Sequence, residues 1–87
     1  MEIILKIPEF SKTNGFQYNW HDNFKIETQI TDNKEIILSA NKEGLISLAN
    51  HLLNLAQDSV PINYHLHFDE YNSLEEMSKE LIIQKIK

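Results

Sequence analysis

The sequence predicts a single α+β domain in which one amphipathic helix packs on one face of an antiparallel β-sheet. Several short segments alternate apolar and polar residues with a period of two, which is typical of strands with one buried face. Between residues 41 and 58 the apolar spacing changes to three and four, which is typical of a helix. The predicted order is β-β-β-β-α-β-β, with about five to six strands in the sheet.

Four of the predicted strands precede the helix. They cover residues 2–7, 16–20, 24–31 and 35–40. The first ends at Pro8, which has no backbone N–H to donate to a neighbouring strand. Turn-forming residues, including Asn14-Gly15 and Asp32-Asn33, separate the strands. Such short connections favour an antiparallel meander.

The helix is predicted to begin after Asn41, whose side chain can accept a hydrogen bond from a first-turn N–H. Ser59 and Pro61 mark its end. Its apolar residues form one stripe, which we expect to lie flat against the sheet. The main members of this stripe are Leu45, Leu48, Ala49, Leu52, Leu53 and Ala56.

Two further strands are predicted after the helix. Residues 62–69 alternate clearly, with Asn63, His65, His67 and Asp69 on the solvent-facing side. Residues 79–86 are ambiguous, because residues 73–76 fit a helical capping box whereas the β-branched isoleucines that follow favour a strand. We favour the strand and keep the helix as the alternative.

Composition excludes several classes of function. The 87 residues form one domain, residues 1–87, without cysteine, which excludes disulfides and thiolate chemistry. Eight lysines, no arginine and 13 acids give a net charge of −5, so the chain is a poor nucleic-acid binder and a better ligand for a basic protein. No signal peptide or membrane-spanning segment is recognisable, so we expect a cytoplasmic protein.

Nothing in the sequence predicts an enzyme or a cofactor. The adjacent acids of residues 69–76 are well solvated, and catalytic carboxylates need a cleft. His65, His67 and Asp69 share one strand face and form the alternative hypothesis, a metal-binding domain or metal-dependent enzyme. However, a metal site needs further close ligands, and alternation alone explains polar residues there.

Binding of a protein partner is the favoured interpretation. Aromatic anchors ringed by polar groups are typical of interfaces. The residues predicted to bind the partner are Asp69, Glu70, Tyr71, Glu75, Glu76 and, second, Trp20. These acids are suited to cover the basic groove of a nuclease, whereas Trp20 fits either a core or an interface. A homo-oligomeric module, or a homodimer closed through the open sheet face, is a further alternative.

Several runs of the C-terminal half resemble a bacterial family, immunity protein family thirty-two of polymorphic toxin systems. The runs are Asn41-Lys-Glu-Gly-Leu-Ile-Ser-Leu-Ala49, His51-Leu-Leu53, His65-Leu-His-Phe-Asp-Glu70, Leu74-Glu-Glu76 and Ser78-Lys-Glu-Leu-Ile-Ile83. The resemblance covers roughly residues 35–87. It implies a small α+β immunity protein that neutralises a cognate toxin by binding it, with no catalytic residues.

The same resemblance implies that residues 78–83 form the closing strand of the domain. The chain departs from the family pattern just before that strand. The family often has a glycine at this point, where this sequence has Met77.

Overall fold

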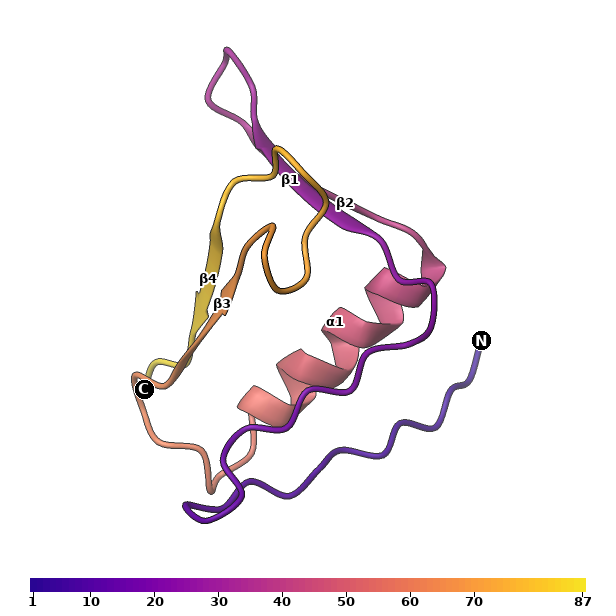
Figure 1. The fold of residues 1–87 in the computed structure, drawn as a ribbon. Coiled ribbons are helices and arrows are strands. Elements are labelled where there is room, and N and C mark those ends of the chain that lie inside the picture. Colours follow the sequence, from indigo (N-terminus) through magenta and orange to yellow (C-terminus); the bar gives the residue numbers. More distant parts are fainter.

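A computed structural model describes all of residues 1–87 and contains one helix and four strands (Figure 1). The elements are β1 (Ile26–Ile30), β2 (Ile36–Ala40), α1 (Lys42–Leu55), β3 (His65–Phe68) and β4 (Leu81–Gln84). The predicted α+β class is confirmed. The predicted single sheet of five to six strands is not, because β1 pairs with β2 and β3 pairs with β4 in two separate antiparallel sheets.

Strands β1 and β2 form a hairpin that projects past the helix at the top of Figure 1. Its register places Ile26 opposite Ala40 and Ile30 opposite Ile36. Ile26 is buried near the helix, whereas Ile30 and Ile36 are exposed near the hairpin turn. The apolar face of the hairpin is therefore covered by the rest of the molecule only at its base.

The segment that leads into β4 covers the outer edge of β1. The Glu75 N–H donates to the Ile26 carbonyl oxygen (2.9 Å), and the Lys79 N–H donates to that of Thr28 (3.2 Å). Ile26 and Thr28 therefore direct their backbone groups away from β2. In an antiparallel ladder, the residue directly opposite such a residue also directs its backbone groups away from the partner strand. The backbone groups of Leu38 and Ile36 in β2 therefore point outward, and the outer edge of β2 is open.

The two strands predicted at residues 2–7 and 16–20 are absent. The N-terminal segment, residues 1–24, runs alongside α1 without regular structure, apart from an isolated bridge between Ser11 and Gly15 (Figure 1). The backbone of this segment forms hydrogen bonds with side chains of α1 instead of with a neighbouring strand. These bonds join Asn50 Nδ2 to Lys6 O (3.1 Å), Asn54 Nδ2 to Gln17 O (2.9 Å), His51 Nε2 to Asn19 N (3.1 Å) and Ser47 Oγ to His21 N (2.9 Å).

The start of α1 follows the sequence prediction. Asn41 caps the helix, and its Oδ1 accepts hydrogen bonds from the Gly44 N–H (2.8 Å) and from the Lys25 N–H (3.0 Å). The first turn lies very close to β1. A Cβ atom at Gly44 would come within 2.6 Å of the Lys25 carbonyl oxygen and 2.9 Å of the Ile26 side chain. Glycine is therefore needed for this close approach.

The predicted orientation of α1 is wrong. Among the six residues of the predicted apolar stripe only Leu48 is buried, and the other five are exposed. The buried face carries mostly polar residues in addition to Leu48 and Leu55, namely Ser47, Asn50, His51 and Asn54. The helix is turned this way because these side chains bond the backbone of the N-terminal segment.

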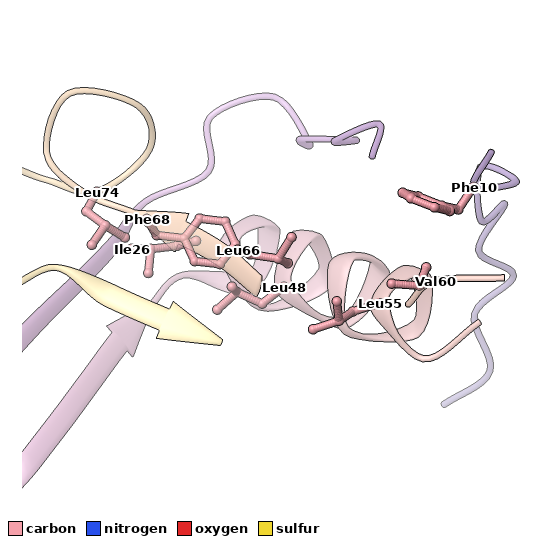
Figure 2. Close-up of a cluster of buried hydrophobic side chains, with 8 residues drawn as sticks. All are labelled: Phe10, Ile26, Leu48, Leu55, Val60, Leu66, Phe68 and Leu74. Carbon is pink, nitrogen blue, oxygen red and sulfur yellow. The ribbon is translucent and has the colours of Figure 1, made fainter. Parts of the chain in front are cut away.

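The hydrophobic core lies along the inner face of α1, between the helix and β3 (Figure 2). Its buried members are Phe10, Ile26, Leu48, Leu55, Val60, Leu66, Phe68 and Leu74. In β3, Leu66 and Phe68 point inward and alternate with the exposed His65 and His67, as the sequence predicts. The strand starts later than expected, because Asn63 has a left-handed backbone conformation (φ 72°).

The ambiguous C-terminal segment is a strand, β4, so the preferred prediction is confirmed and the helical alternative is wrong. Residues 73–76 form part of a turn and not a helix. The one helix of the structure, α1, has neither the length nor the apolar character needed to cross a membrane.

Candidate partner-binding surface

The predicted binding residues cluster in the connection between β3 and β4, residues 69–77, here called the acidic turn. Asp69 organises its first half. The Asp69 carbonyl oxygen accepts from the N–H groups of Ser73 (3.0 Å) and Leu74 (2.8 Å). Its carboxylate Oδ1 accepts from those of Tyr71 (2.9 Å) and Asn72 (3.1 Å). Asp69 therefore shapes the turn, and its carboxylate is already engaged within it.

Three further contacts hold the acidic turn in place. The Leu74 side chain is buried in the core. The Asn72 Nδ2 donates to the His67 carbonyl oxygen (3.0 Å), which ties the turn to β3. The Glu70 Oε2 accepts from the Met77 N–H (3.1 Å), where the chain adopts a left-handed conformation (φ 70°) before entering β4. The turn is therefore a pre-shaped platform.

The remaining predicted residues of the turn face solvent. The Tyr71 side chain is 90% exposed. Glu70, Tyr71, Glu76 and Met77 line one depression of about 350 Å³. Glu75 is exposed too, but it borders a different depression, next to Lys25 and Glu27. The structure thus brings Glu70, Tyr71 and Glu76 together and leaves Glu75 on an adjoining surface.

Trp20 belongs to both the core and the surface. Its ring stacks on Phe24 (4.4 Å between centroids) and meets the His51 ring edge-on (4.3 Å). The exposed part of Trp20 borders a pocket of about 90 Å³. The other residues that line this pocket are Tyr18, His67, Phe68 and Asn72. Because Asn72 is part of the acidic turn, the pocket opens beside that turn.

His51 is the principal site residue that the sequence prediction missed. It is fully buried, and its Nε2 accepts the Asn19 N–H, so the proton of the neutral ring sits on Nδ1, which has no partner. Burial lowers the pKa of His51 to about 4. The sequence prediction gave His51 no role beyond its place in the run His51-Leu-Leu53 that carries the family resemblance. The recurrence of Ser47, His51 and Asn54 at helical spacing was the signal for a second, polar stripe.

The predicted metal alternative gains no support from the geometry. The His67 Nδ1 lies 2.9 Å from the Glu80 Oε1, and the His65 Nδ1 lies 3.1 Å from the Asn63 carbonyl oxygen. The Asp69 carboxylate is engaged in the turn. No group of three or more histidine, cysteine, aspartate or glutamate side chains is arranged to hold a metal ion.

Comparison with known proteins gives one finding. A family model described as immunity protein 32 matches residues 35–86, a range that contains β2, α1, the acidic turn and both strands of the second sheet. Neither the comparison with curated proteins nor that with solved structures returned a match. Trp20 and the N-terminal segment lie outside the matched range. Because the match covers more than half of the chain, the chain belongs to the immunity protein 32 family.

Proposed function

We propose that this protein protects bacteria by binding the toxic domain of a cognate effector of a polymorphic toxin system, through the acidic turn and the neighbouring Trp20 pocket. Membership of an immunity family supports a protein partner. The observation that carries the choice of surface is Tyr71, whose side chain stands 90% exposed beside the carboxylates of Glu70 and Glu76. An exposed tyrosine on a pre-shaped turn is a favourable binding anchor, because little conformational entropy is lost on docking.

Electrostatics indicates the chemistry of the partner. The chain carries a net charge of −5 and no arginine. Complementary charge speeds association and disfavours wrong partners, so the bound surface of the toxin is basic. A nuclease domain has such a surface, because it must neutralise phosphates. Carboxylates that cover this surface would keep the nucleic-acid substrate out without any catalytic step in the immunity protein.

The Trp20 pocket supports a second, more specific contact. The rings of Tyr18 and Trp20 are nearly parallel (3°), and Phe68 stands almost perpendicular to both (79°). Aromatic faces attract ammonium and guanidinium groups by about 0.5–2 kcal/mol. A lysine or arginine side chain of the toxin is therefore the ligand that this small aromatic pocket fits, next to the carboxylates of the turn.

Co-expression tests the proposal directly. The chain is produced together with each toxin domain encoded beside it, and cell survival and complex formation are measured. Tyr71→Ala and Glu76→Lys are expected to weaken the complex by about tenfold or more and to abolish protection. The matched control Glu2→Lys makes the same charge change at an exposed residue near the N-terminus, outside the acidic turn. This variant should protect cells as the wild type does. Protection that survives Tyr71→Ala and Glu76→Lys combined would reject the acidic turn as the binding surface.

A further inference from the structure

The outward face of α1 is apolar and has no partner within the chain. Leu45, Ala49, Leu52 and Ala56 recur at spacings of four, three and four, and are here called the outer stripe. Leu45 is 54% exposed and Leu52 is 48% exposed, and Leu53 beside them is 52% exposed. Contiguous exposed apolar residues of this kind mark an interaction surface in proteins that are otherwise well packed.

We propose that the outer stripe binds a second copy of the same chain, with the two α1 helices packed antiparallel about a twofold axis. This goes beyond toxin binding, since it concerns a different surface. It also moves the predicted homodimer contact from the open sheet face to the helix. In a twofold interface the same patch serves both copies, so the patch must be complementary to itself.

The outer stripe has this self-complementarity. With the twofold axis between Ala49 and Leu52, antiparallel packing places Leu45 opposite Ala56 of the second copy and Leu52 opposite its Ala49. Every leucine then faces an alanine, and large and small side chains interdigitate along the seam. Parallel packing would place leucine against leucine and alanine against alanine, with a worse fit in each layer.

Charge favours the same arrangement. The outer stripe contains no acid, so two chains of net charge −5 meet without opposing carboxylates along the seam. The exposed Lys42 stands at the N-terminal end of α1, and the last turn of α1 has no basic residue. Antiparallel packing brings Lys42 of each copy to the C-terminal end of the other helix, where a cation is stabilised by the helix dipole.

The size of the interface sets the expected affinity. A helix of 14 residues is about 21 Å long, so one helix face is well below the roughly 800 Å² per partner of a standard stable interface. The dimer is therefore weak and reversible, with a dissociation constant between about 10 μM and 1 mM.

Sedimentation of the full chain from about 10 μM to 2 mM tests the proposal, and a monomer–dimer equilibrium is expected in that range. Leu52→Glu should weaken dimerisation by about tenfold or more, because each dimer then buries two carboxylates. The matched control Ile82→Glu changes an isoleucine that is 52% exposed on β4, and it should leave dimerisation unchanged. Lys42→Glu should weaken the dimer, whereas Lys87→Glu should not.

The orientation is tested by cross-linking, which is clean because the chain has no cysteine. The double variant Leu45→Cys with Ala56→Cys should form disulfide-linked dimers, and Leu45→Cys alone should not. Efficient dimers from Leu45→Cys alone would indicate parallel packing and overturn the proposal. Because both positions are exposed, the cysteine variants also serve if Leu52→Glu fails to fold.

A chain that remains monomeric at 2 mM would also overturn the inference. If Leu52→Glu then abolishes protection, the outer stripe belongs to the toxin-binding surface. Toxin binding through Tyr71 can succeed or fail independently of either result, so the two proposals are distinguishable.

Discussion

The N-terminal segment and the family-matched part of the chain are held in place by different kinds of interaction. Residues 1–24 contain no helix or named strand, and side chains of α1 bond their backbone. Residues 35–86 contain most of the regular elements and six of the eight core residues. The first region is held by polar side chains of α1 in addition to the apolar contacts of Phe10 and its other aromatic rings, whereas the second is held mainly by the packed apolar core. Four predictions test this difference.

The largest effect is expected in the core of the family-matched part. Leu66→Ala should destabilise the protein by about 2–5 kcal/mol, because a fully buried leucine is replaced by a cavity. Denaturant unfolding measures this loss. Ile82→Ala, on the exposed side of the adjacent strand, is the control and should cost far less. Equal losses in the two variants would contradict the placement of the core.

The next effect concerns His51, which joins the two regions. Its pKa is about 4 in the folded protein and about 6.5 when unfolded, so the unfolded chain binds more protons between these values. Neutral His51 therefore makes its full contribution to the free energy of unfolding above pH 6.5. This contribution falls by an amount on the order of 2–3 kcal/mol as the pH drops towards 4. The rings packed around His51 belong to Tyr18, Trp20 and Phe68, none of which carries a carboxylate.

Unfolding free energies measured from pH 7.5 to 4.5 provide the test. His51→Gln keeps an acceptor for the Asn19 N–H but does not titrate, so its stability should vary less over this range. A wild type and a His51→Gln variant with parallel pH profiles would show that His51 does not control this dependence.

A smaller effect is expected where α1 binds the N-terminal segment. Asn54→Ala removes the donor to the Gln17 carbonyl oxygen and should cost about 1–3 kcal/mol. The loss should be local, so trypsin should cleave after Lys12 faster while the core remains folded. Asn33→Ala, in the exposed hairpin turn, is the control. Unchanged cleavage in Asn54→Ala would mean that the segment is held mainly by its apolar contacts.

The smallest effect is expected for Met77→Gly, which should stabilise the protein and not destabilise it. Met77 has a left-handed conformation (φ 70°) and is 89% exposed, so Met77→Gly removes backbone strain without loss of packing. We expect a gain of about 0.5–1 kcal/mol, measured as a rise in Tm. Met77→Leu should give no gain. A lower Tm in the glycine variant would show that the flexibility of unfolded glycine outweighs the relieved strain.

The elements that the sequence predicted well depend on local patterns. Asn41 and the apolar period define α1, and alternation defines the two hairpin strands and β3. The N-terminal strands failed, because alternation becomes a strand only when the segment lies beside an edge with which it can pair. Residues 1–24 lie alongside α1 instead, and polar side chains of that helix bond their backbone.

The rotation of α1 could not be predicted from its own sequence. The helix carries an apolar stripe through Leu45 and Leu52 and a polar one through Ser47 and Asn54. The stripe that faces inward is decided by the segment that packs against the helix. Here that segment is residues 1–24, and its backbone groups form hydrogen bonds with the polar stripe. For the candidate site, the sequence found the residues of the acidic turn. It did not reveal that Asp69 is engaged internally or that Asn72 joins the turn to the Trp20 pocket.

The open outer edge of β2 has a consequence for handling the protein. Its residues Ile36, Ile37 and Leu38 form a short uncharged run with unpaired backbone groups along one side. Such an edge is a template for cross-β growth, and only Lys34 and Glu35 flank it as gatekeepers. Fibril formation during concentrated storage should therefore start at this strand, and a lysine at Ile37 would slow it.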